Sequence, residues 1–429
     1  MNRHTYHAVP GTEAIAPSVP RLCTLRLKGI DRTIVLPDDP ELVEALSSCI
    51  HGWPSDLQPL DPATLATPDP SALAPLCVIE PRGPGIYRTH SRYLDRPFDK
   101  LPAATAICTL LADLSQAYSE TPGDHVFGLH CGAVTICGTT LVLAGARRAG
   151  KSTLVARLSA FPEVDILCDD VLPIAADGRA VALGLAPRLR LPLPEGASPA
   201  FRQHVTRWLG PADDRYGYLP TPNLLSHGKT VPAHVFLLLD RRDEGPARLH
   251  GLTEDETLCR LLERSIAGPA GPEPSFAAAH DLAKRLTGLR LVYSDLEEAT
   301  TLLLRHFGRL GEDRQDFGPV SPPLAPTAPE SPETPAEIDQ TMPFVRASDA
   351  AVRRVGDAAF IWRPGDVMLW HLNPVARAIW AMLDEPAPAT LLVEVLGELF
   401  PDETPERLAS DLQGLMARLC AEGLIHPAG

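Results

Sequence analysis

The sequence predicts an α/β domain with a mixed sheet, followed by a proline-rich linker and a small α+β domain. First, residues 125–308 alternate short apolar runs with segments of helical periodicity. Second, a glycine-rich loop stands between one such run and a helical segment. Third, residues 319–343 hold eight prolines, no lysine or arginine, and few large apolar side chains. We therefore divide the chain into residues 1–120, 121–310, 311–343 and 344–429.

The composition excludes several classes of protein. A net charge of -15 argues against nucleic acid as the main partner, because phosphate contacts need a basic face. The sequence has no apolar run long enough to span a membrane, and its first residues lack the apolar run of a signal peptide. The nine cysteines include no Cys-x-x-Cys pair, so we expect free thiols rather than disulfides or a zinc site. These features predict a cytoplasmic protein without a membrane partner.

The N-terminal region, residues 1–120, is predicted to be α+β, and its sequence suggests no chemistry. Residues 22–27 and 32–36 alternate in the way of two strands. Residues 40–50 have the pattern of a short helix. Residues 101–118 have that of a longer amphipathic helix leading into the next domain.

In residues 121–310 we predict strands at 130–136, 140–144 and 165–168, and a buried strand at 233–240. An Asp177-Gly178 turn predicts a hairpin between 171–175 and 179–183. Two later helices are expected to begin with capping boxes, Thr253 with Glu256 and Ser294 with Glu297.

The loop GARRAGKS is a complete P-loop. The pattern Gly-x-x-x-x-Gly-Lys-Ser needs its two glycines so that bare backbone can wrap phosphates. Lys151 is expected to reach the β- and γ-phosphates of ATP, and the Ser152 hydroxyl to ligate Mg²⁺. The predicted nucleotide-binding residues are Gly145, Ala146, Arg147, Arg148, Ala149, Gly150, Lys151, Ser152 and Thr153.

A carboxylate pair, Asp169-Asp170, follows Lys151 after enough chain for one helix and a return strand. Phosphoryl transfer to a hydroxyl needs a group to accept the proton and a ligand for the metal. We therefore expect the pair to share these roles, and the sequence leaves open which aspartate takes which. The alternative is that one of them only caps the hairpin that follows.

His130, the P-loop and the Cys168–Val171 step together resemble the catalytic core of HPr kinase/phosphorylase and related serine-kinase-like proteins. The resemblance covers about residues 127–307. It implies a P-loop kinase domain of the HPr kinase/PEP carboxykinase type, with His130 beside the phosphates. The alternative for His130 is a structural histidine at the end of a strand. Motor ATPases share the P-loop, but their distant Asp-Glu strand and Ser-Gly-Gly signature are missing.

Two features of that family are missing from the sequence. Its Glu-x-Arg-Gly signature has no match, although Arg188 or Arg190 could supply the arginine, each with an exposed strand face as the alternative. The loop associated with HPr recognition and phosphorolysis is not visible. The sequence therefore gives no support for HPr as the acceptor or for the reverse reaction.

In residues 344–429 the pattern predicts three strands and then three helices. The strands are expected at 352–355, 358–362 and 367–372. Asn373 and Pro374 are an N-cap and a first helical residue. Further helices are expected at 390–400 and 406–422.

The phrase Leu-Asn-x-x-Ala-x-x-Ile-Trp at residues 372–380 resembles the PqqD family of peptide-binding modules. The resemblance implies a winged-helix-like fold in which a leader peptide adds beside the third strand and packs on the third helix. DNA binding is disfavoured because that helix carries only two arginines. The implied peptide-binding residues are Val367, Met368, Leu369, Trp370, His371, Leu412, Leu415 and Leu419.

Together these features predict an ATP- and Mg²⁺-dependent kinase that phosphorylates a serine-type hydroxyl of a ribosomally made precursor peptide. Two alternatives stay open. One is a kinase for a small molecule, such as free serine or a sugar, with a partner-recruiting tail. The other is a non-catalytic nucleotide-binding scaffold. The related kinases are often oligomeric, so a homo-oligomer is compatible with the resemblance.

Overall fold

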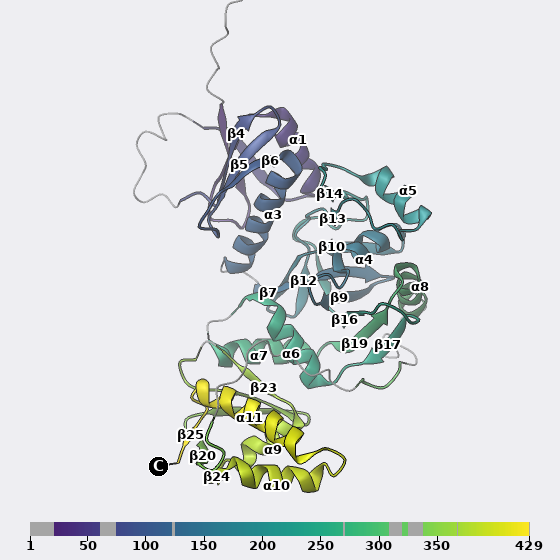
Figure 1. Ribbon diagram of the computed structural model, residues 1–429. Coiled ribbons are helices and arrows are strands. Elements are labelled where there is room, and N and C mark those ends of the chain that lie inside the picture. Colours follow the sequence, from purple (N-terminus) through teal and green to yellow (C-terminus); the bar gives the residue numbers. More distant parts are fainter. Residues whose placement is uncertain are drawn as a thin grey trace, which may run out of the picture.

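The computed structural model describes residues 21–60, 74–121, 125–268, 271–308, 320–324, 338–366 and 368–428. Three regions follow one another along the molecule: an N-terminal region, a central α/β domain and a C-terminal domain (Figure 1). Most of the predicted linker at 311–343 lies outside the described residues. Within the described part of the chain, no helix is long and apolar enough to cross a membrane. All nine cysteines are free thiols.

The N-terminal region is a six-stranded sheet in the order β3-β1-β2-β4-β5-β6, with two helices. The strands are β1 (Leu22–Leu27), β2 (Ile34–Pro37), β3 (Ser55–Pro59), β4 (Cys77–Gly83), β5 (Ile86–Ser91) and β6 (Phe98–Pro102). The helices are α1 (Pro40–Cys49), capped by Asp39, and α3 (Ala103–Glu120). The α+β prediction holds for the described part of this region, and its apolar side chains share one core with the central domain.

The central domain contains a six-stranded sheet in the order β10-β8-β9-β16-β19-β17. Its strands are β8 (Gly132–Ile136), β9 (Thr139–Gly145), β10 (Val164–Cys168), β16 (Val235–Arg241), β17 (Arg248–Gly251) and β19 (Thr287–Tyr293). The strands β9, β16 and β19 are parallel, whereas β8, β10 and β17 pair antiparallel. The predicted mixed sheet is therefore present, and β9 delivers the P-loop at its carboxyl end.

A second, five-stranded sheet has the order β15-β12-β11-β7-β18. Its strands are β7 (His125–His130), β11 (Val171–Ala175), β12 (Arg179–Val181), β15 (Thr230–Pro232) and β18 (Ser265–Ala267). The predicted hairpin is its β11–β12 pair. The strand predicted at 130–136 is instead two strands, because the chain crosses between the two sheets at Cys131.

The remaining elements of the central domain are helices and one small ribbon. The helices are α4 (Lys151–Leu158), α5 (Pro199–Trp208), α6 (Glu254–Arg264), α7 (Pro272–Ala283) and α8 (Leu296–Phe307), and the ribbon pairs β13 (Arg188–Arg190) with β14 (Tyr216–Tyr218). The capping box of Thr253 and Glu256 is present at α6. The second predicted box is wrong: Asp295 caps α8 by accepting from the Glu298 amide. Glu297 instead accepts hydrogen bonds from Arg157 of α4.

The C-terminal domain has two three-stranded sheets, in the orders β21-β22-β23 and β24-β20-β25, and three helices. The elements are β20 (Pro343–Arg346), β21 (Ala351–Val355), β22 (Ala358–Trp362), β23 (Trp370–Leu372), α9 (Pro374–Met382), β24 (Ala387–Pro388), α10 (Ala389–Leu399), α11 (Pro405–Ala421) and β25 (Ile425–Pro427). The three predicted helices and the Asn373 cap are present. The third strand is shorter than predicted, and the second sheet was not predicted, because its strands have only two to four residues.

The C-terminal domain packs against α6 and α7 of the central domain (Figure 1). Phe360 and Trp362 of β22 join a buried cluster with Phe276 of α7, and the Phe276 and Phe360 ring centroids are 5.4 Å apart. The opposite face of the same sheet packs on the helices of its own domain. Burial on both faces explains why all five residues of β22 are buried apolar side chains.

Candidate functional site

The P-loop joins β9 to the N-terminus of α4. Gly150 is the N-cap of α4 at φ 93°, and it supplies no side-chain hydrogen bond to the helix. The first amide N–H groups of α4 are therefore open to an anion. The Tyr293 hydroxyl at the end of β19 donates to the Ala149 carbonyl at 2.6 Å, which fixes the loop to the sheet.

Both loop glycines are required by close approach. A Cβ at Gly150 would lie 2.5 Å from the Tyr293 hydroxyl oxygen, in a backbone conformation that favours glycine. A Cβ at Gly145 would lie 3.1 Å from the Leu239 carbonyl oxygen of β16. The loop thus holds a tight bare-backbone cradle, which fits a nucleotide phosphate.

Lys151 lies at the first turn of α4, and its Nζ donates to the Gly145 carbonyl at 3.1 Å. The ammonium group thus folds back across the cradle. Burial and the charge of Arg264 lower the pKa of Lys151, and the charge of Asp170 opposes this shift. Lys151 therefore lies close enough to Asp170 for the two charges to interact.

Asp169 and Asp170 lie in the connection between β10 and β11, and His130 is the last residue of β7. The pairing of β7 with β11 places Val171 opposite His130, so the pair lies beside the histidine. The His130 Nε2 is 3.1 Å from the Asp170 Oδ1. Three of the four predicted catalytic residues, His130, Asp169 and Asp170, therefore lie at one end of the five-stranded sheet, and the fourth is Lys151 of the P-loop.

Arg188 also belongs to this group. Its backbone N–H donates to the Asp169 Oδ2 at 2.9 Å, and its guanidinium lies 3.8 Å from the Asp170 Oδ2. The sequence could not choose between Arg188 and Arg190. The structure places Arg188 at the carboxylates, whereas Arg190 is exposed at the far end of β13.

The two carboxylates have different electrostatic environments. Burial and the neighbouring charge of Asp170 raise the pKa of Asp169 to about 7, although Arg188 opposes the shift. Burial also acts to raise the pKa of Asp170, but the hydrogen bond with His130 and the charge of Arg188 outweigh it and lower the pKa. Two carboxylates with divergent pKa values suit a site that must both hold charge and handle a proton.

The predicted metal ligands are Ser152, Asp169 and Asp170. Within the part of the chain that the structure describes, no group of three His, Cys, Asp or Glu side chains could hold a metal ion alone. Mg²⁺ commonly binds through one or two carboxylates together with substrate phosphates. The residues present fit that kind of site, with Ser152 beside the phosphate cradle and the carboxylates at the adjoining sheet end.

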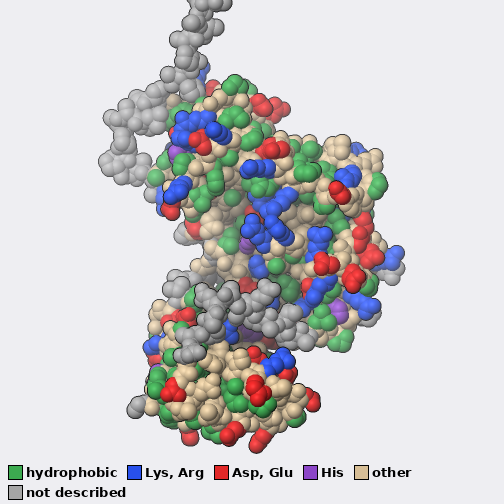
Figure 2. All heavy atoms as spheres, viewed as in Figure 1, with side chains coloured by type: hydrophobic (Ala, Val, Ile, Leu, Met, Phe, Trp, Pro, Cys, Tyr) green, Lys and Arg blue, Asp and Glu red, His purple; other side chains and the backbone are tan. Residues whose placement is uncertain are grey.

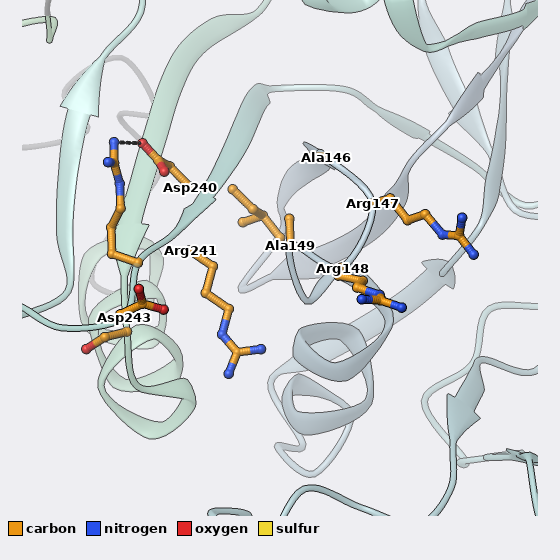
Figure 3. Close-up of a pocket in the computed structure, with 10 residues that line it drawn as sticks. Ala146, Arg147, Arg148, Ala149, Asp240, Arg241 and Asp243 are labelled. Carbon is orange, nitrogen blue, oxygen red and sulfur yellow. Dashed lines mark hydrogen bonds and ion pairs between the residues drawn. The ribbon is translucent and has the colours of Figure 1, made fainter. Parts of the chain in front are cut away.

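A cavity of about 460 Å³ adjoins the other side of the P-loop. It is lined by Ala146 to Ala149 and by residues at the end of β16, among them Asp240, Arg241 and Asp243 (Figure 3). Sequence reasoning missed this second wall. The signal was available, because parallel strands carry loops at the same edge of a sheet, and residues 233–240 were predicted as a buried strand.

Asp240 in that wall has cationic partners of its own. Its Oδ2 is 2.7 Å from an Arg242 nitrogen and 4.0 Å from one of Arg290 (the dashed line in Figure 3 joins Asp240 and Arg242). Asp240 is therefore paired with arginines of its own and does not contact His130 or Arg188.

The predicted peptide-binding residues differ in their strand pairing and burial. Trp370 and His371 lie in β23, an edge strand, whereas exposed Met368 and half-buried Leu369 precede it and have no strand pairing. Val367 lies outside the described residues. Leu412 and Leu419 are buried in the domain core, so a peptide cannot reach them in this structure. Leu415 is half-buried and remains a candidate.

Comparison with known proteins gives one family match. The family model described as Coenzyme PQQ synthesis protein D (PqqD) matches residues 358–425, which confirms the resemblance predicted for the C-terminal domain. No curated protein matches the chain.

Among solved structures, the chain is similar to the Hpr(Ser) kinase/phosphatase from Coxiella burnetii, a member of the family that the P-loop motifs resemble. The sequence identity is 11%, the similarity covers 42% of this chain and 93% of that chain, and the TM-score is 0.22. Because that score is low, nothing about the site is taken from that structure.

Proposed function

We propose that this protein is an ATP- and Mg²⁺-dependent kinase that phosphorylates a serine-type hydroxyl of a precursor peptide. The observation that carries the proposal is one chain with a phosphate cradle, a carboxylate pair whose Asp170 interacts with the charge of Lys151, and a PqqD-matching domain. The cradle supplies a place for the donor. The C-terminal domain supplies a means of choosing the acceptor.

In the proposed reaction the acceptor oxygen attacks the γ-phosphorus of ATP. An O–P bond forms, the bond from the γ-phosphorus to the β,γ-bridging oxygen breaks, and ADP leaves with that electron pair. The hydroxyl proton passes to a carboxylate of the pair. Lys151 and the α4 amides hold the phosphates. Mg²⁺, held by Ser152 and a carboxylate, would neutralise charge on the β- and γ-phosphate oxygens.

Asp170 is the better candidate for proton acceptor. Its side chain is 40% exposed, so an acceptor hydroxyl can reach it, and His130 orients it at 3.1 Å. Asp169 is only 8% exposed and is held by the Arg188 amide, which suits a positioning role. Access decides between them, since a base must come within hydrogen-bonding distance of the proton that it takes.

The leader of the precursor would bind by adding a strand to β23. Main-chain hydrogen bonds to the open edge would give affinity, and side chains around Leu415 would give register. Binding of the leader makes transfer to the core peptide effectively intramolecular, so the local acceptor concentration reaches about the millimolar range.

The test is incubation of a leader-bearing precursor peptide with the protein, ATP and Mg²⁺, followed by mass spectrometry. We expect a phosphate mass shift that Lys151→Ala reduces by at least about 10³-fold, since the lysine contacts the transferring group. Asp170→Asn should give a similar loss, and Asp281→Asn, at an exposed position of α7, should serve as the matched control with nearly normal activity. Phosphorylation that persists in Lys151→Ala and Asp170→Asn would falsify the assignment.

A further inference from the structure

Building on the proposed function, we propose that Arg264 is a further catalytic residue that contacts the transferring phosphoryl group. Arg264 is the last residue of α6, far in sequence from the P-loop and from the carboxylate pair. No sequence motif singles it out. Arg264 is identified instead by its position at the end of the five-stranded sheet.

Strand pairing brings Arg264 to the same sheet end as the other site residues. β7 lies between β11 and β18 and is antiparallel to both. Val171 opens β11 opposite His130, so Asp170 lies beside the end of β7. Ser265 opens β18 opposite Leu129, so Arg264 lies beside the same end on the other flank. His130 is therefore flanked by an acid on one side and by an arginine on the other.

Arg264 has no hydrogen bond or ion pair with any residue that the structure describes, and its Nε is shielded from solvent without an acceptor. The other two cations at this site are partnered: Lys151 with the Gly145 carbonyl, and Arg188 near Asp170. Arg264 is half-buried, and a shielded guanidinium nitrogen without an acceptor is costly to keep. That cost is offset when an anion occupies the site.

The position of Lys151 indicates where that anion would lie. After burial, the charge of Arg264 is the largest influence that lowers the pKa of Lys151, so the two cations lie close enough to repel each other. A phosphate held by the P-loop lies within reach of Lys151. A guanidinium on the acceptor side would then bind phosphoryl oxygens as their charge redistributes in the transition state, and its fork of donors suits this task.

A structural role is the competing explanation. A basic residue in the last turn of a helix interacts favourably with the helix dipole. That role predicts a loss of stability without a specific effect on the transition state. Arg260, on the same helix but paired with Glu263, provides a matched control that keeps the helix charge comparable.

The test compares Arg264→Gln, Arg264→Lys and Arg260→Gln in the full chain by thermal shift. The probes are ADP with Mg²⁺, and ADP with Mg²⁺ and aluminium fluoride, which mimics the transferring phosphoryl. We expect Arg264→Gln to retain ADP stabilisation but to lose the added stabilisation by aluminium fluoride. Arg264→Lys should retain part of it, and Arg260→Gln all of it. With a peptide that the unaltered protein phosphorylates, the kcat of Arg264→Gln should be lower by about 10²-fold or more.

Three results overturn the proposal. The first is normal aluminium fluoride stabilisation in Arg264→Gln. The second is an equal loss with ADP alone, or a general loss of stability, which supports the helix-end role. The third is the lack of any aluminium fluoride effect in the unaltered protein. These results are distinct from failure of the proposed function, because the fluoride complex reports on the phosphoryl site without a peptide acceptor.

Discussion

The two ends of helix α6 lie in two chemically different regions. Its C-terminal end reaches the proposed phosphoryl site, where His130 and Arg188 both lie beside Asp170. Its N-terminal end meets the C-terminal domain, where Asp255 lies 3.3 Å from the His371 Nε2 of β23. That strand has a partner on one side only, among the residues that the structure describes. The donor region is therefore largely preformed, whereas the acceptor region is left open.

The difference has a physical basis. Charged groups at a shielded site are stabilised when they are paired, and Asp169, Asp170 and Arg188 of the donor region are fixed by one another. An edge strand presents unpaired backbone groups and can add a strand from another chain. Natural proteins usually protect such edges, and one common protection is to keep the edge strand short, as β23 is. The residues that precede β23 have no strand pairing, so they do not cover its edge as a further strand. Selectivity should therefore depend on the open edge, and the chemical step on the preformed site.

The first and largest expected effect tests whether selectivity for the acceptor depends on the open edge of β23. A core peptide without its leader should have a KM for phosphorylation about 10²-fold higher than that of the full precursor, with a small change in kcat, because the leader supplies only effective concentration. Met368→Pro should reproduce part of that rise with the full precursor, since the exposed Met368 lies where pairing would extend beyond β23. Initial rates measured over a range of peptide concentrations give both constants.

The control for this prediction uses the same variant with the leaderless peptide. Met368→Pro should leave that peptide's kinetics unchanged, which distinguishes a binding defect from a folding defect. If leaderless and full precursors are phosphorylated equally well, the C-terminal edge does not select the acceptor.

The second prediction concerns the free-energy cost of ionising the buried Asp169. The folded-state pKa of Asp169 is about 7, because of burial and the charge of Asp170. A carboxyl group whose pKa is raised on folding binds more protons in the folded state, so stability falls as pH rises from about 4 to about 7. Asp169→Asn removes this ionisation. The variant should therefore be more stable than the unaltered protein at pH 8, by about 1–3 kcal/mol.

Chemical denaturation at pH 5 and pH 8, without nucleotide or metal, measures this effect. The difference between the two proteins should shrink at the lower pH, where Asp169 is protonated in the folded state. The Asp240→Asn variant is the control, because Asp240 is neutralised by its own arginines. A stability difference that does not depend on pH would mean that Asp169 is not strained by its ionisation.

Local features of the fold could be predicted well from the sequence. The β9–P-loop–α4 unit, the β11–β12 hairpin and the Asn373 cap each depend on residues close together in the chain. The capping box at Ser294 was wrong because Asp295, one residue later, is an equally good cap and leaves Glu297 free to pair with Arg157. Local patterns fix the presence of an element better than its exact end.

The site was only partly predictable, because its remaining members meet through long-range pairing. Arg188 and Arg190 lie on the same face of a strand, so periodicity alone could not distinguish them. The choice follows from the β10–β11 connection, which reaches only Arg188. Arg264 had no signal at all, since only the register of β18 on β7 brings it to His130.

The smallest expected effect concerns the contact between the two regions. If α6 transmits leader binding to the phosphoryl site, the pair of Asp255 and His371 should couple to catalysis with the leader-bearing peptide. The pair is 3.3 Å apart, and the hydrogen bond with His371 lowers the pKa of Asp255 against the effect of burial. We expect Asp255→Asn and His371→Gln each to reduce kcat/KM by about two- to fivefold, with a coupling energy of about 0.5–1 kcal/mol.

A double-mutant cycle on kcat/KM measures that coupling, and the pair Arg353 and Glu273 provides the control. That pair joins the same two domains at 2.7 Å, but through α7 rather than α6. Because α7 does not end in a site residue, its cycle should show no effect on kcat/KM for either peptide. If both cycles give equal coupling, the domains communicate through their general packing. Strictly additive effects at Asp255 and His371 would instead show that α6 positions Arg264 but does not couple leader binding at β23 to catalysis.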